Sequence, residues 1–181
     1  MLRSNQTTAA GVLRRKVDPG GRLGLDDHAD AISEALVKHE MRINCGRVTR
    51  EYVNTTTDVR AFDAVLGGVV WDDTTVLEDN DGATVTGVTF DPVRGRWTVD
   101  TPAVFTYTPT VTGYAYMVDH AAADIAEMVA TDLGAGSDFT TAGGESFTRS
   151  GPVERLLETA RRLRAGAPLH TVPVNTPSNL R

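Results

Sequence analysis

Several kinds of residue and segment are scarce in this 181-residue chain. The single cysteine, Cys45, excludes an internal disulfide and any zinc or iron–sulfur site built from several cysteines. No stretch approaches the roughly 18 consecutive apolar residues of a membrane-spanning helix. Residues 1–11 lack the charged and apolar regions of a signal peptide. We therefore expect a soluble protein that does not enter a membrane and is not secreted by that route.

Lysine is also rare, with two residues against 16 arginines, and the 24 acidic residues outnumber the 18 basic ones. The resulting net charge of -6 disfavours a broad basic face that grips phosphate backbones. Apolar residues make up 40% of the chain and aromatic residues 6%, which is enough for a core of modest size. The length bounds the chain at one domain, with or without arms.

Hydrophobic periodicity predicts an α+β fold, in which helices flank a small antiparallel β-sheet or sandwich insertion. Apolar residues recur at helical spacing in three segments, whereas short Val-, Thr- and aromatic-rich runs between the first two predict about five strands. The helices are expected over residues 27–43, over residues 114–133 and from Ser150 to residue 165, where Gly166 and Pro168 stop the last one, and the strands over residues 47–112.

Four segments follow from these elements. They are an extended N-terminal arm (1–24), a main body of helix, sheet and long helix (25–133), a Gly- and Ser-rich linker with the last helix (134–165), and an extended C-terminal arm (166–181).

Two local features of the strand region can be predicted in more detail. The loop from Asp91 to Gly95 predicts a hairpin between Phe90 and Arg96, with Gly95 in a left-handed conformation. Trp71 and Trp97 both lie in strand-like runs, and we expect at least one of them in the core of the sheet.

The motifs of enzymes and metal sites are incomplete. The run Asp79–Gly82 lacks the EF-hand register, and His39-Glu40 lacks the second histidine of a zinc protease motif. Ser146 lacks the glycine that a nucleophile elbow needs two residues later. Asp72-Asp73 is interpreted as solvated charge. We therefore expect no catalytic residue, no cofactor and no metal, and a structural or binding protein rather than an enzyme.

One order of motifs does stand out. The helix that ends near Gly46-Arg47 is followed by Arg60–Asp63, by the run Phe105–Thr108, by the step Gly113-Tyr114 into an alanine-rich helix, and by the segment from Ser146 to Arg164. Over residues 25–165 this order resembles the head–tail connector, or adaptor, proteins of long-tailed bacteriophages. Members of that family usually carry a proline shortly after the Gly-Tyr step, where this chain has Met117-Val118.

The resemblance implies a virion neck protein that assembles in the host cytoplasm. Such a protein forms a ring, usually of twelve subunits, between the portal protein and the next neck or tail-completion protein. Genomic DNA passes through the ring without specific binding, and the acidic balance of this chain agrees with that expectation. The competing interpretation is a stand-alone β-rich module that binds a ligand or another protein.

The resemblance also implies that the C-terminal segment docks on the portal. The docking candidates are one aromatic anchor, two leucines and five arginines: Phe147, Arg149, Arg155, Leu156, Leu157, Arg161, Arg162 and Arg164. Arginine gives bidentate contacts to carboxylates. The alternative is that Leu156 and Leu157 pack on the preceding helix while the arginines complement the helix dipole.

Overall fold

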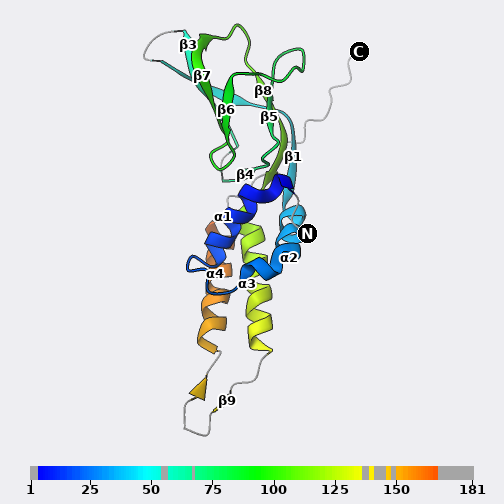
Figure 1. Cartoon of the computed structure of the whole chain (residues 1–181), viewed down its shortest axis with the longest axis vertical. Helices are drawn as coiled ribbons and strands as arrows, with labels where there is room; N and C mark the ends of the chain where they lie inside the picture. The colour runs from blue at the N-terminus through cyan, green and yellow to red at the C-terminus, as the bar shows by residue number, and fades with distance from the viewer. Residues whose placement is uncertain are drawn as a thin grey trace.

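The computed structural model describes residues 4–53, 57–66, 68–135, 139–140, 146–147 and 150–166. The molecule is elongated, with helices at one end and two β-sheets at the other (Figure 1). The expected α+β class is confirmed. The helices, including two short 3-10 turns, are η1 (Ser4–Gln6), α1 (Thr7–Val17), η2 (Leu25–His28), α2 (Ala29–Lys38), α3 (Val118–Gly134) and α4 (Ser150–Gly166).

Two antiparallel sheets of four strands each make up the β end. In the first sheet, β8 (Thr110–Tyr116) is the central strand. It pairs with β1 (Glu40–Gly46) on one side and with the short strands β4 (Val70–Trp71) and β5 (Val76–Glu78) on the other. The second sheet has the order β2 (Val48–Tyr52), β3 (Asp58–Ala64), β7 (Arg96–Val104) and β6 (Val88–Asp91). A short hairpin, β9 (Phe139–Thr140) and β10 (Ser146–Phe147), lies between α3 and α4.

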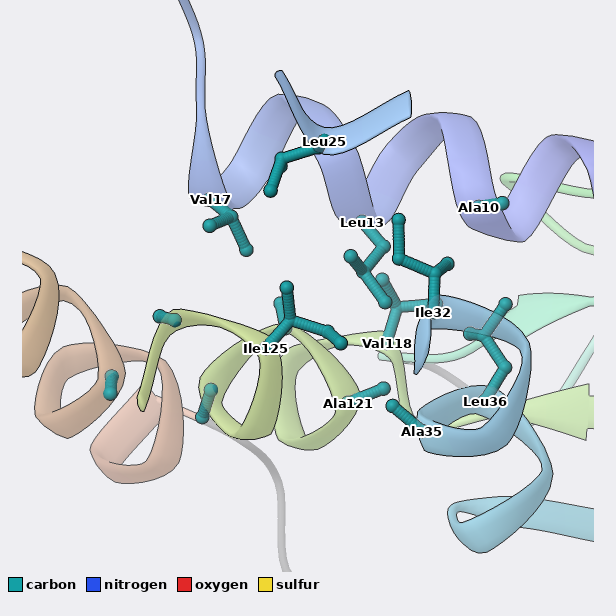
Figure 2. Close-up of a cluster of buried hydrophobic side chains, with 14 of the residues drawn as sticks. Ala10, Leu13, Val17, Leu25, Ile32, Ala35, Leu36, Val118, Ala121 and Ile125 are labelled. Atoms are coloured by element: carbon teal, nitrogen blue, oxygen red, sulfur yellow. The ribbon is translucent and has the colours of Figure 1, made fainter. Parts of the chain in front are cut away.

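Each end of the molecule has its own hydrophobic core. The helical core joins α1, α2, α3 and α4, with Leu13, Ile32, Leu36 and Ile125 among its buried side chains (Figure 2). The β core lies around Trp71 and Trp97, which are both 1% exposed, so the expectation that at least one tryptophan is buried is confirmed.

The predicted extended arm over residues 1–24 is wrong for much of its length, because residues 7–17 form α1. Ala9, Ala10, Leu13 and Val17 fall on one side of this helix and are buried against the helical core. Two of these four side chains are alanines, which are small and only weakly hydrophobic. The apolar face of α1 is therefore hard to recognise in the sequence, although it is buried in the fold. Of the predicted C-terminal arm (166–181), Gly166 belongs to α4, and the other residues lie outside the described part of the chain.

The first predicted helix ends too late. Helix α2 stops at Lys38, and Ile43 lies in β1, where Met41 and Ile43 follow the two-residue period of a strand. In the second predicted helix, Tyr114 belongs to β8 and pairs with Arg42, so α3 begins at Val118. The third predicted helix is confirmed as α4.

The predicted β region is too short and has too few strands, because the described residues from 40 to 116 contain eight strands. The run Phe105–Thr108, which the sequence suggests as a strand, is the loop between β7 and β8. The β6–β7 hairpin is confirmed, with Gly95 at φ 64°. A Cβ at Gly95 would lie 2.4 Å from Trp71 Nε1, so this glycine serves both the turn and the packing.

Candidate docking surface

Helix α4 packs on α3 with one side. Leu156 and Ala160 are buried, and Val153 and Leu163 are partly buried against the same core. The four residues lie at the three- and four-residue spacing of one helix face. Leu156 is therefore not accessible for docking, and for this residue the alternative of packing within the subunit is correct.

The opposite side of α4 carries most of the remaining candidates. Arg155, Leu157, Arg161 and Arg162 are exposed, and we call this set the α4 outer face. Glu158 lies among them, 3.0 Å from Arg162 Nε and 3.5 Å from Arg161 Nη1. A guanidinium has five N–H donors, so both arginines keep donors for another partner.

Arg155 Nε donates to the carbonyl of Gly151, one turn earlier, at 3.2 Å. This bond turns the guanidinium toward the N-terminal end of α4, and it occupies one of its five donors. The remaining donors of the α4 outer face can meet a planar, bidentate acceptor such as a carboxylate.

The β9–β10 hairpin lies at the distal end of the α3–α4 hairpin (Figure 1). Phe147 is in β10, opposite Phe139 of β9. Arg149 falls outside the described residues. The β9–β10 hairpin, and with it the backbone of Phe147, lies at the end of α3 and α4 that is away from the two four-stranded sheets (Figure 1).

Arg164, at the other end of α4, is already paired inside the subunit. Its Nη2 lies 3.1 Å from Asp124 Oδ1 and 2.7 Å from Glu127 Oε2, both on α3. Asp124 Oδ2 also accepts from Lys38 Nζ at 2.6 Å and lies 3.0 Å from His39 Nε2. Arg164 is therefore a structural link among α2, α3 and α4 rather than part of the α4 outer face.

These partners determine the ionisation of Asp124. Burial alone would raise the pKa of this carboxyl, but hydrogen bonds from Lys38, His39 and Arg164 outweigh burial and lower the pKa to about 2. Asp124 is consequently ionised at neutral pH, and its charge holds three helices together.

A second polar cluster, which the sequence does not predict, joins the two ends of the molecule. Asp72 is fully buried, so its interpretation as solvated charge is wrong. Its Oδ2 accepts from Asn5 Nδ2 at 2.7 Å and from Tyr116 Oη at 2.8 Å, and its Oδ1 accepts from the Thr74 amide at 2.8 Å. Burial, and then the bond to Asp72, raises the pKa of Tyr116, so the phenol stays protonated and donates.

The neighbouring acid fixes the start of α1. Asp73 Oδ2 accepts from the Thr8 amide at 3.2 Å, and the Asp73 amide donates to the carbonyl of Asn5 at 3.1 Å. A carboxylate near the first turn of a helix also interacts favourably with the positive end of the helix dipole. No residue spacing links positions 5 and 72, so only the fold could reveal this cluster.

The remaining sequence candidates take simple structural roles. Asp79 Oδ1 accepts from the amides of Asp81 and Ala83 at 2.9 Å each, which makes the acidic run a turn. Within the described part of the chain, no group of three or more His, Cys, Asp or Glu side chains is arranged to hold a metal ion. None of the described helices is long and apolar enough to cross a bilayer.

Comparison of the chain with family models, with curated proteins and with solved structures finds no match.

Proposed function

We propose that this protein is a structural subunit of a bacteriophage virion neck, a head–tail connector that forms a homo-oligomeric ring on the portal protein. The ring would complete the head, provide the DNA conduit and offer the attachment site for the next neck or tail-completion protein. The observation that carries this proposal is the α4 outer face, on a helix that is covered by α3 on one side and exposed on the other.

The chemistry of this face agrees with a protein partner rather than with DNA. Leu157 is 36% exposed, and Arg161 lies one turn after it on the same flank of α4, while Arg155 and Arg162 lie farther round the exposed side of the helix. Such a set fits a partner that offers carboxylates around a small apolar pocket. The net charge of -6 opposes tight binding to phosphates, which agrees with a conduit along which DNA slides.

The elongated shape supports the ring. Two small cores, rather than one large core, leave a high ratio of surface to volume, and symmetric association is a common way to bury such surface. The α3–α4 hairpin extends from the β end, so neighbouring subunits side by side would align their α4 helices along one face of the ring (Figure 1).

The test is co-assembly with the portal protein of the same phage, followed by negative-stain imaging and native mass measurement. We expect the wild-type chain to cap the portal as a ring. The triple substitution Arg155→Glu, Arg161→Glu and Arg162→Glu should weaken capping by at least about 100-fold, because it replaces donors by like charges.

Arg94→Glu is the matched control, since Arg94 is an exposed arginine that pairs with Asp91 three residues earlier, as Arg161 pairs with Glu158. Equal capping by the triple variant and the control would contradict the assignment of the docking face. A chain that never associates with a portal would contradict the connector itself.

The alternative, a stand-alone binding module, is supported by an exposed apolar pair on the second sheet. Tyr52 at the end of β2 and Val104 at the end of β7 are 44% and 60% exposed and lie at the same end of that sheet. A monomer that binds a ligand through Tyr52, with no affinity for a portal, would favour this alternative.

A further inference from the structure

The helical end and the β end are connected at a narrow junction. In the described residues, the chain enters the β end at His39, between α2 and β1, and leaves it at Met117, between β8 and α3. The two connections lie side by side, because the Met117 amide donates to the His39 carbonyl at 3.0 Å. The rings of His39 and His120 also stack there, with centroids 5.6 Å apart. Residues at the ends of elements absorb the backbone rotations of a hinge, so this pair of connections can act as one.

Apolar packing across the junction is limited. Most buried side chains of the helical core come from helices, and Val70 and Tyr116 are the two that come from strands. Among the described helices, α1 makes the main contact with a strand, at β4, whereas α2, α3 and α4 pack mainly on other helices (Figure 1). The helical end can therefore turn relative to the sheets while most of each core stays intact.

A polar tie crosses the junction beside this hinge. We call it the clasp, and it consists of Asn5, Thr8, Asp72 and Asp73. Asn5 Nδ2 donates to Asp72 Oδ2 at 2.7 Å, and the Asn5 carbonyl accepts from the Asp73 amide at 3.1 Å. The Thr8 amide donates to Asp73 Oδ2 at 3.2 Å. All three bonds join η1 or the first turn of α1 to the loop between β4 and β5, so together they fix how the helical end lies against the sheets.

The residue next to Asn5 gives the clasp a reason to open. Gln6 is fully buried, and its Oε1 accepts from Ser33 Oγ at 2.8 Å, but its Nε2 has no hydrogen-bond partner among the described residues. A buried donor without an acceptor has lost the water that it would bond in an open structure. The closed junction therefore carries a cost that opening relieves, and the three bonds of the clasp oppose that cost.

We propose that the clasp holds the angle between the two ends of the molecule, and that it opens while both cores stay folded. When its bonds break, the helical end turns about His39 and Met117, and water reaches Gln6. Asp72 keeps Tyr116 as a donor in the open position, so its carboxylate is not left without a partner. This inference goes beyond the connector function and does not depend on it.

Two amides that lie two residues apart test whether the clasp opens before the fold does. The Asp73 amide crosses the junction to Asn5, whereas the Trp71 amide donates to the Pro92 carbonyl within the β end. We expect the Asp73 amide of the full-length wild-type chain to exchange with solvent at least about tenfold faster than the Trp71 amide, after correction for intrinsic rates. Equal exchange of the two amides would overturn the proposal, because the clasp would then open only when the β end unfolds.

A second experiment measures the angle through the distance between two spin labels. One label is attached to Cys45, which is exposed in β1, and the other to α3 through the substitution Asp132→Cys at an exposed position. The clasp variant combines Asn5→Ala with Asp73→Ala in this labelled chain. We expect its distribution of label distances to be at least about twice as wide as that of the chain with the intact clasp.

The matched control combines Thr7→Ala with Asp79→Ala. These substitutions also remove hydrogen bonds, but the bond from Thr7 ends on Ser4 and those to Asp79 stay within one turn, so none crosses the junction. Equal widths in the clasp variant and the control would overturn the proposal. The amides of Ile125 in α3 and Trp97 in β7 should exchange equally slowly in both variants. Faster exchange of these amides in the clasp variant would mean that the clasp holds the cores rather than the angle, and would also overturn the proposal.

Discussion

At the scale of single residues, the most informative side chain is Asp72. It is fully buried, yet four donor groups converge on its carboxyl group: the side chains of Asn5 in η1 and Tyr116 in β8, and both the amide and the hydroxyl of Thr74 after β4. A buried carboxylate is tolerated only when such donors replace the water it loses. Asp72 therefore links η1 to the β end.

Replacing Asp72 by alanine should lower the free energy of unfolding by about 3 kcal/mol, because buried donors on Asn5, Tyr116 and Thr74 lose their acceptor. Urea denaturation of the variant and the wild type measures this loss. Asp81→Ala is the control, since Asp81 is exposed and should change stability by no more than about 0.5 kcal/mol. A cost for Asp72→Ala as small as that of the control would show that the buried cluster does not stabilise the fold.

At the scale of secondary-structure elements, Asp124 links α2, α3 and α4 through its bonds to Lys38, His39 and Arg164. Its pKa is lowered from 3.8 to about 2 in the folded chain. A lowered carboxyl pKa stabilises the folded state above the unfolded pKa, and this contribution is lost as the pH falls through the folded pKa. The relevant window thus lies between about pH 4 and pH 2.

We expect Asp124→Asn to remove about 2 kcal/mol of stability at neutral pH and to have little effect near pH 2, where the wild-type carboxyl is losing its charge. Urea unfolding of both proteins at several pH values gives the difference. Asp132→Asn on the same helix is the control, because Asp132 is exposed. A difference between Asp124→Asn and the wild type that is constant across this window would contradict the lowered pKa.

The elements differ in how well the sequence predicts them. Helix α4 could be predicted because Pro152 favours the first turn of a helix and Gly166 favours its end. The β6–β7 hairpin could be predicted because Gly95 favours the left-handed conformation of its turn. These preferences depend on the local sequence and not on tertiary contacts. Helix α1 was missed because its buried face depends on alanines, whose burial follows from contacts with α3. Ile43 lies seven residues after Leu36, which fits a helical period, and two residues after Met41, which fits a strand period. Pairing with β8 decides in favour of the strand.

The candidate docking residues show the same limit. Their positions on α4 follow from the helical period, but the period does not say which side α3 covers. Leu156 and Leu157 are neighbours in the sequence, and tertiary packing buries the first while the second stays 36% exposed. Arg164 resembles the other arginines of α4 in the sequence, and only the fold brings it to Asp124 and Glu127.

At the scale of the whole molecule, the two cores predict separable effects of mutation. Leu156→Ala should destabilise the helical end by about 3 kcal/mol, because it leaves a cavity between α3 and α4. Leu157→Ala, one residue later, should cost much less because Leu157 is partly exposed. Thermal melts followed by circular dichroism measure both costs.

The tryptophans report on the other core, so their fluorescence provides the second measurement. Trp71 and Trp97 contact each other with ring centroids 6.2 Å apart, inside the β core. In Leu156→Ala we expect their emission to stay blue-shifted and protected from iodide until the β end itself unfolds. Loss of that protection together with the helical signal would show that the two ends unfold as one unit.

The α3–α4 hairpin can also be considered as a mechanical beam. Each helix has 17 residues and is thus about 25 Å long, and the β9–β10 hairpin is at the free tip (Figure 1). A sideways force on that tip acts with the full length of the beam as its lever arm, and the bending moment is greatest at the base. The Asp124 carboxylate lies in this part of the hairpin, with its partners Lys38, His39 and Arg164. The region that bears the largest bending moment is therefore also held together by these polar contacts.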